Sequence, residues 1–323
     1  MQRVDLSIVI PALDEEKSIS ELHLLITKSL DKKKINYEII FVDDGSKDST
    51  WNEIEKIINY NKNVKGIKFK KNYGKSDALD AAFKNSSGDF ILTMDADLQD
   101  DPYEIYKLLE IIKNKKFDLV SGWKKKRNDP LGKTIPSKFF NYVTRVFSGI
   151  HLNDFNCGIK IYRREVIESI DLYGEMHRYI PLIAKWNGYN FIGEKVVNHN
   201  KRKFGKTKFG MERFVRGFLD LLSVSFVYRF KHRPMHFFGS LGVLFFLVGF
   251  VSVGLITYEK ISKISQNIPL DLIRPVTDQP LFYVALVSII IGVQLFLVGF
   301  LSELIIQINS DKKRYKIDKT KNV

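Results

Sequence analysis

Four aspartates lie within seven residues of this chain, and they are its first candidates for chemistry. They are Asp95, Asp97, Asp100 and Asp101, in the segment FILTMDADLQDDP. Carboxylates this close repel one another, which raises their proton affinity unless a cation lies between them. The whole chain carries a formal net charge of +14, so a local concentration of acids needs a specific reason. A divalent metal ion bound among these side chains is the simplest one.

Within this segment Asp97 is the leading candidate metal ligand. Its hard carboxylate oxygens suit Mg²⁺ or Mn²⁺. Asp100 and Asp101 have a simpler alternative, which is to cap a helix that starts near Pro102.

The segments that must position these acids alternate short apolar runs with helical periodicity. The runs that predict strands are rich in Ile, Val and Phe: LSIVIPA, YEIIFVDDG, VKGIKF, DFILTMDAD and FDLVSGW. Between them, apolar residues three and four apart predict helices within residues 15–30, 50–60, 74–85 and 101–114. This alternation over residues 1 to about 200 predicts an α/β domain, with a mostly parallel sheet covered on both faces.

The predicted topology brings two acidic strand ends together. Asp43 and Asp44 follow the second predicted strand, and Asp95 and Asp97 follow the fourth. Ligands of such sheets gather at the carboxyl ends of the strands, so we expect these acids to share one crevice. The sequence has no Gly-x-Gly-x-x-Gly and no Walker-type phosphate loop, which disfavours an ordinary dinucleotide or ATP site.

Charge and cysteine content restrict the partners. The chain has 51 Lys and Arg against 37 Asp and Glu, which favours nucleic acid, acidic lipid or phosphorylated substrates. The single cysteine, Cys157, excludes an internal disulfide and fits a reducing compartment. The early apolar segment LSIVIPAL is too short to span a membrane and lacks a small-residue cleavage site. It predicts a buried strand and not a signal peptide.

Two long runs, residues 235–258 and 279–302, contain no Lys, Arg, Asp or Glu. A helix needs about 20 apolar residues to cross a bilayer core, so each run predicts a transmembrane helix. Two buried core helices are the alternative. Basic residues flank the pair on both outer sides, whereas those in the connecting loop are balanced by acidic ones. Excess Lys and Arg stay in the cytoplasm, which places both termini there and the loop outside.

These features predict four parts of the chain. They are a cytosolic domain over residues 1–208, a juxtamembrane amphipathic helix over 209–234, a transmembrane hairpin over 235–307 and a basic tail over 308–323. Residues 136–150 predict a second interfacial helix. Ordinary packing against the domain is the alternative for both amphipathic segments. The basic tail is expected to be attracted to acidic lipid.

Five motifs, in order and followed by two spans, resemble those of polyprenyl-phosphate glycosyltransferases. The motifs are IVIPALDEE, FVDDGSKDST, KNYGKSDAL, TMDADLQDDP and NCGIKIYRREV. This family includes dolichyl-phosphate mannose synthase and the bacterial bactoprenol glucosyltransferases, which are inverting glycosyltransferases of family two with a GT-A fold. The resemblance covers nearly the whole chain. One Asp-x-Asp occurs by chance in many proteins, but five ordered motifs with a hairpin are specific.

The resemblance implies that a nucleotide-diphosphate sugar donates its sugar, with inversion, to a membrane polyprenyl phosphate such as undecaprenyl phosphate. Mg²⁺ or Mn²⁺ would neutralise the charge that develops on the departing diphosphate. UDP-glucose is the expected donor, and GDP-mannose or a UDP-aminoarabinose derivative are the alternatives. The product would serve cell-envelope glycans at a bacterial inner membrane, with the catalytic domain in the cytosol. Relatives suggest a homotetramer.

The resemblance also assigns residues to the site. It gives the metal Asp97 and Gln99, with Asp95 nearby for metal or ribose. It places the nucleotide against Pro11, Leu13, Glu15, Asp44 and Ala96. Local capping of the chain is the alternative for Glu15 and Asp44.

Asp154, in LNDFNCGIK, matches the position usually proposed as the catalytic base. The second pKa of a phosphate monoester is about 6. The acceptor phosphate is therefore largely dianionic at neutral pH, and little proton removal is needed before it attacks. Asp154 therefore has two alternatives, which are to orient a cation or the sugar, and to stabilise a turn.

Two basic segments, GWKKKRNDP and HNKRKFGKTKF, supply candidate cations for the lipid phosphate and the diphosphate. Arg127 and Arg202 are favoured because Arg binds phosphate bidentately. Lys124 is a further candidate for the donor, and most other members of these runs are expected to lie on a solvated face.

Other classes of function fit less well. A processive polysaccharide synthase would carry a Gln-x-x-Arg-Trp motif and more spans, and neither is present. A transferase with a soluble acceptor would use the hairpin only as an anchor. A non-catalytic membrane scaffold would not need the intact acids. A nucleic-acid binder fits the charge but not two spans with acidic strand ends, so no nucleic-acid partner is expected.

Overall fold

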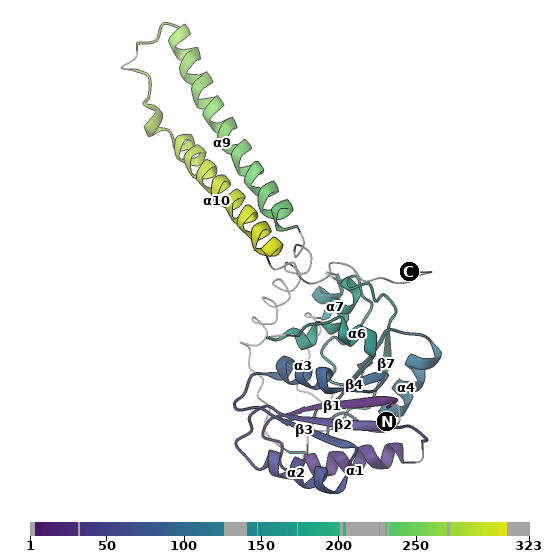
Figure 1. Cartoon of the computed structure of the whole chain (residues 1–323). Helices are drawn as coiled ribbons and strands as arrows, with labels where there is room; N and C mark the ends of the chain where they lie inside the picture. The colour runs from purple at the N-terminus through teal and green to yellow at the C-terminus, as the bar shows by residue number, and fades with distance from the viewer. Residues whose placement is uncertain are drawn as a thin grey trace. The chain divides into compact units, whose positions relative to one another are not determined.

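The computed structural model describes residues 4–31, 33–125, 141–146, 148–172, 174–200, 203–204, 226, 230, 233–269 and 272–308. The chain divides into two compact units, Met1–Val224 and Ser225–Val323 (Figure 1).

A seven-stranded sheet forms the centre of the first unit, in the order β3-β2-β1-β4-β6-β5-β7. Its strands are β1 (Leu6–Ala12), β2 (Tyr37–Asp43), β3 (Val64–Lys68), β4 (Phe90–Thr93), β5 (Leu119–Trp123), β6 (Lys160–Arg163) and β7 (Ile192–Val196). β6 runs antiparallel to both of its neighbours, and all other pairs are parallel. The five strands predicted from sequence are confirmed, whereas β6 and β7 were not predicted.

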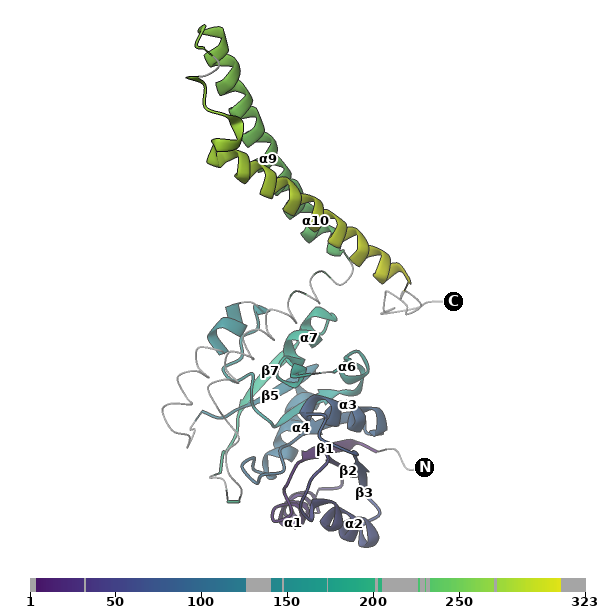
Figure 2. The same cartoon turned by 90° about the vertical axis from the view of Figure 1, so that its left-hand side faces the viewer.

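Helices cover both faces of this sheet. The buried Ile and Leu side chains of α1 (Ile19–Leu30), α2 (Thr50–Tyr60) and α4 (Glu104–Asn114) join one core cluster with the strands. α3 (Lys75–Asn85) contacts β1 and β2 and also α6 (Arg164–Glu168). Figures 1 and 2 show α1 and α2 on one side of the strands and α3 on the other. The remaining elements of this unit are η1 (Met176–Arg178) and α7 (Ile180–Trp186).

The strand sequences explain this layering. In β1, Leu6, Ile8, Val9 and Ile10 are all 0% exposed, because a parallel strand covered by helices buries both of its faces. Register places Ala12 opposite Asp43, and Val9 opposite Thr93. β1, β2 and β4 therefore end at one edge of the sheet, and the acidic segments begin there.

Two long helices, α9 (Pro234–Ser265) and α10 (Pro280–Ile308), make up most of the second unit, with the short helix η3 (Val276–Asp278) before α10. They pack through glycines: a Cβ on Gly242 would lie 3.0 Å from the Gly292 carbonyl oxygen. Small residues allow such close helix approach in membranes. The predicted spans lie inside α9 and α10 except for Gln279, one residue before α10, and both helices continue beyond the predicted C-terminal ends.

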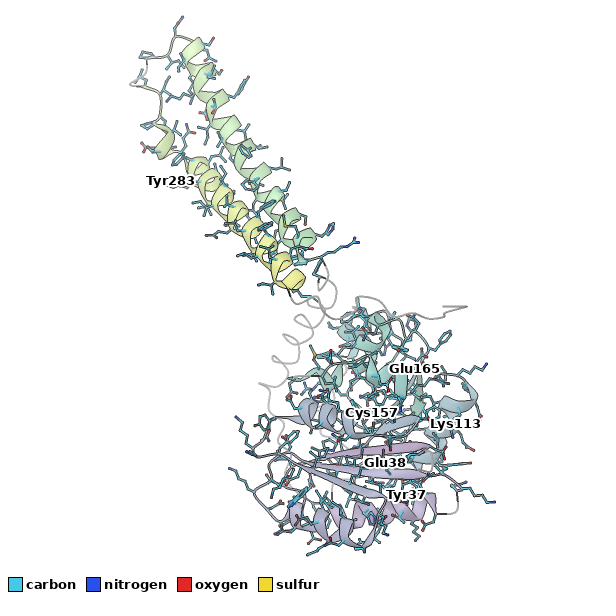
Figure 3. The ribbon with its side chains drawn as sticks, in the orientation of Figure 1. Tyr37, Glu38, Lys113, Cys157, Glu165 and Tyr283 are labelled. Atoms are coloured by element: carbon cyan, nitrogen blue, oxygen red, sulfur yellow. The ribbon has the colours of Figure 1, made fainter. Side chains whose placement is uncertain are left out.

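Both helices are long and apolar enough to cross a membrane, and only 28% and 22% of their most apolar windows are buried. A core helix of a water-soluble domain would be mostly covered. Figure 3 shows many side chains of both helices, Tyr283 among them, pointing outward from the pair. The predicted juxtamembrane helix over 209–234 and the basic tail lie almost entirely outside the described residues.

Candidate active site

The loop after β4 carries the predicted metal ligands. The Asp97 side chain is largely buried, and its Oδ1 accepts a hydrogen bond of 3.1 Å from the Gln99 backbone N–H. Leu98 between them has a φ of 61°, an uncommon conformation for a non-glycine residue, which makes the loop turn sharply.

Among the described residues, no group of three or more His, Cys, Asp or Glu side chains is arranged to hold a metal ion. Mg²⁺ usually binds through one or two carboxylates and takes its other ligands from phosphates and water. The oxygen donors of Asp97, Gln99 and Asp95 fit an ion of this kind when a diphosphate completes its coordination.

Asp95, at the start of the same loop, accepts a hydrogen bond from the Lys75 Nζ, and both side chains are about a third exposed. Lys75 is the first residue of α3. Burial alone would raise the pKa of Asp95, but the charges of Lys75 and Lys124 outweigh it and hold that pKa well below its usual range. Asp95 is therefore ionised, and its charge is balanced by Lys75.

Asp100 forms a second ion pair, with Lys124 at 2.8 Å, and its side chain is fully buried. Burial tends to lower the pKa of Lys124, but Asp100 and its neighbours raise it above its ordinary value. The structure thus pairs Lys124, which was predicted to bind the nucleotide-sugar donor, with the Asp100 carboxylate. Neither Asp100 nor Asp101 is the N-cap of α4, because the helix starts at Glu104 and its N-cap is Tyr103. Asp101 accepts the Tyr103 backbone N–H at 3.0 Å, just before the helix.

The NCGIK motif, residues 156–160, lies against the loop that carries Asp95, Asp97 and Asp100, called here the acidic loop. A Cβ added to Gly158 would lie 2.5 Å from the Asp95 Oδ2 and 2.9 Å from the Asp100 Oδ2. Only glycine leaves room for both carboxylates at this point. Cys157, labelled in Figure 3, is buried, and burial raises the pKa of its thiol to about 12, so it fills space and does not act as a nucleophile.

Asp154 comes from the same segment and is 1% exposed. Its Oδ1 accepts the Asn156 backbone N–H at 3.1 Å. The nearby Lys160, the first residue of β6, is also buried and donates to the Cys157 carbonyl oxygen. Burial lowers the pKa of Lys160, and the charges of Asp154 and Asp95 act in the opposite direction. The structure thus brings the predicted base and an additional cation into one electrostatic cluster with Asp95.

A carboxylate from β7 holds the backbone around Asp154. Glu194 Oε1 accepts the Asn153 N–H at 2.7 Å and the Asp154 N–H at 3.0 Å, and its Oε2 accepts the Asn153 Nδ2 at 2.7 Å. Burial raises the pKa of Glu194, and these hydrogen bonds oppose that shift. Sequence reasoning missed Glu194, because nothing in its local pattern indicates a partner some forty residues away.

Replacing Glu194 by Gln should lower kcat about tenfold and leave the KM for the nucleotide sugar unchanged. A neutral amide is a weaker acceptor for backbone donors than a carboxylate, and bonds to charged groups contribute about 1.5–3 kcal/mol. Steady-state kinetics with saturating acceptor would measure both constants. Glu165→Gln, an exposed change on α6, is the control, and equal kcat values in the two variants would contradict the role.

The residues predicted to face the nucleotide lie at the ends of β1 and β2. Pro11 belongs to β1, and Leu13 and Glu15 follow it. The Glu15 Oε2 accepts the Ser18 hydroxyl at 2.9 Å. Asp44 accepts the backbone N–H groups of Tyr73 at 2.7 Å and Gly74 at 2.9 Å, and burial raises its pKa. In this structure Asp44 holds the loop before α3, and its contact with base or ribose stays a prediction.

Both favoured arginines, Arg127 and Arg202, lie outside the described residues. The backbone N–H of Asn200, two residues before Arg202, donates to the Gln99 carbonyl oxygen at 2.8 Å. The chain thus enters its second basic segment from beside the loop that carries the predicted metal ligands. Lys75 was missed as a site residue, although it stands in the KNYGKSDAL motif.

Comparison with known proteins places the chain among glycosyltransferases. Residues 7–171 match the family model described as glycosyl transferase family 2. A dodecaprenyl-phosphate galacturonate synthase from Rhizobium johnstonii is 35% identical over 308 residues, covering 94% of this chain and 88% of the relative. An undecaprenyl-phosphate 4-deoxy-4-formamido-L-arabinose transferase from Shewanella sediminis is 34% identical over 225 residues, covering 69% of this chain and 67% of the relative.

Solved structures support the fold. Glucosyl-3-phosphoglycerate synthase from Mycobacterium tuberculosis, crystallised with Mn²⁺, UDP-glucose and phosphoglyceric acid, has a TM-score of 0.51 at 18% identity. The match covers 69% of this chain and 80% of that one. The predicted α/β GT-A architecture is therefore confirmed. The chain belongs to glycosyl transferase family 2, within its polyprenyl-phosphate glycosyltransferases.

Proposed function

We propose that this protein transfers a sugar from a UDP-sugar to a polyprenyl phosphate at a membrane surface, with inversion and with Mg²⁺ or Mn²⁺ bound. The observation that carries the proposal is the relative that matches 94% of the chain, a share that leaves out fewer residues than either α9 or α10 contains. The sequence-based expectation of glucose as the sugar has no support of this kind. A UDP-hexuronic acid is the first candidate donor, and a UDP-formamidoarabinose is the second.

One buried cation of the site supports an acidic sugar. Lys75 and Lys124 each bind an aspartate, whereas the buried Lys160 bonds to a neutral carbonyl, that of Cys157. A sugar carboxylate would be a stronger partner for this ammonium group than a carbonyl. Lys160 is therefore our candidate for recognising a uronic acid.

Different residues at the carboxyl edge of the sheet would have different roles in sugar transfer. Asp97, Gln99 and Asp95 would hold the divalent ion, which neutralises the leaving diphosphate when it is bound. The β1 and β2 ends, with Pro11, Leu13, Glu15 and Asp44, would bind the nucleotide. Asp154 would orient the sugar or a cation, since a phosphate dianion attacks without losing a proton.

The experiment uses full-length protein in lipid nanodiscs that contain undecaprenyl phosphate. UDP-galacturonate, UDP-glucose, GDP-mannose and UDP-formamidoarabinose are each supplied with Mn²⁺ or Mg²⁺, and labelled sugar in the organic phase is measured. We expect one UDP-sugar to exceed the others by at least about tenfold, with UDP-galacturonate first. Labelled sugar that stays in the aqueous phase with every donor would contradict the lipid acceptor.

Lys160→Met tests the acidic-sugar assignment in the same assay. It should raise the KM for UDP-galacturonate about tenfold and change that for UDP-glucose little, because only the former carries a carboxylate. Equal effects on the two donors would refute the assignment.

A further inference from the structure

The two ion pairs of the acidic loop differ in how accessible they are. Lys124 and Asp100 are 13% and 0% exposed, so their pair is closed to ligands. Lys75 and Asp95 are 32% and 33% exposed, so their pair faces the solvent side of the site. Asp95, a predicted metal ligand, is thus paired with the ammonium group of Lys75, and this pair is accessible from solvent.

The backbone of Lys75 is fixed on both sides of the residue. Before it, Asp44 binds the backbone N–H groups of Tyr73 and Gly74, and Gly74 has a φ of 105°, which glycine adopts without strain. After it, the Ser76 Oγ accepts the His177 backbone N–H at 3.0 Å. These contacts hold the backbone before Lys75 and the Ser76 side chain after it, whereas the four-carbon side chain of Lys75 is intrinsically flexible and its ammonium group is a point charge.

An ammonium group bonded to Asp95 opposes the entry of a divalent cation. Like charges a few ångströms apart repel strongly in a partly buried site, where the effective dielectric constant is well below that of water. Without Asp95, the metal keeps Asp97 and Gln99, which is a weak protein donor set. A bound diphosphate changes this balance because its oxygens attract both the metal and Lys75.

We propose that Lys75 is a placeholder cation that makes metal binding depend on the donor. In the donor-free protein Lys75 neutralises Asp95 and keeps the divalent ion out. When the nucleotide diphosphate arrives, Lys75 moves to its oxygens and Asp95 becomes a metal ligand. The inference rests on the proposed function in one respect, which is that the donor carries a nucleoside diphosphate.

Manganese binding tests this directly, without sugar or lipid acceptor. Free Mn²⁺ is measured by electron paramagnetic resonance while full-length protein is titrated, with and without UDP. Wild type should bind Mn²⁺ at least about tenfold more weakly without UDP. Lys75→Met should tighten UDP-free binding about tenfold, and Lys75→Arg, which keeps the charge, should behave like wild type. An unchanged UDP-free Kd in Lys75→Met, or tight UDP-free binding by wild type, would overturn the proposal.

Lys84→Met provides the matched control. Lys84 lies on the same helix, is 68% exposed and pairs with Asp80 four residues earlier, so its removal should leave both Mn²⁺ affinities unchanged. Equal tightening by Lys84→Met would reduce the effect to net charge and also overturn the proposal. If every donor fails to label lipid while Lys75→Met still tightens Mn²⁺ binding, the proposed function fails and the placeholder role stands. Thermal unfolding of each variant confirms that it is folded.

Discussion

Replacing Asp97 by Asn is expected to lower kcat/KM for sugar transfer by about a thousandfold or more, which corresponds to roughly 4 kcal/mol of transition-state stabilisation. The reason is that a bound divalent ion supplies several kcal/mol to the departure of a diphosphate. Asparagine keeps the side-chain oxygen that accepts the Gln99 N–H, so the loop should keep its shape. Initial rates of lipid labelling, measured over a range of Mn²⁺ concentrations, would give the effect.

Asp101→Asn is the control from the same acidic segment. Asp101 Oδ1 accepts a hydrogen bond from the Tyr103 backbone N–H, and its Oδ2 accepts one from the Asn198 Nδ2. An amide at this position therefore preserves most of the local structure. This variant should retain near-normal rates. An Asp97→Asn enzyme with more than about a tenth of wild-type activity at saturating Mn²⁺ would exclude Asp97 as an essential metal ligand.

Gly158→Ala should reduce kcat/KM about a hundredfold, although the residue takes no part in the chemistry. The added methyl group would meet the Asp95 carboxylate at 2.5 Å and the Asp100 carboxylate at 2.9 Å, so both must shift. Displacing a reacting or metal-binding group by about 1 Å can cost a factor of 10². The same overpacking should destabilise the fold by about 1–3 kcal/mol. Kinetics and thermal unfolding on the same preparation would separate the two effects.

Gly254→Ala is the control, because there the added methyl group meets open space. In the part of the chain that the structure describes, no heavy atom outside the adjoining turns of α9 lies within 4 Å of a Cβ at Gly254, so this variant should keep full activity. A Gly158→Ala enzyme with normal kinetics would mean that the acidic loop tolerates displacement, and it would weaken the placement of Asp95 beside the metal.

The parallel half of the fold was predictable because its signals are local. Runs such as LSIVIPA are apolar at every residue but Ser7, as is typical of strands buried on both faces, and the acids that follow them predict the ligand-binding edge. β6 is only the four residues Lys160–Arg163 and carries two basic residues, so it has no strand pattern. Its direction depends on pairing with β4 and β5, which periodicity does not encode.

The candidate site also has a part that the sequence predicts and a part that it does not. Asp95, Asp97 and Asp154 stand in recognisable motifs, so their types and order were sufficient to propose them. The partners of these acids are distant in sequence: Lys75 precedes Asp95 by twenty residues, and Glu194 follows Asp154 by forty. Tertiary contacts of this kind decide which carboxylates are already neutralised, and no spacing rule predicts them.

The reversed direction of β6 affects how a family with this fold can diversify. Register places Lys160 opposite Thr93, so β6 enters the sheet at the edge where β1, β2 and β4 leave it. The carboxyl edge is therefore built by outgoing chain on the side of the predicted nucleotide site and by incoming chain around Asp154. Insertions before β6 can change the chain around Asp154, where we expect sugar and lipid to bind, and leave the ends of β1 and β2 unchanged.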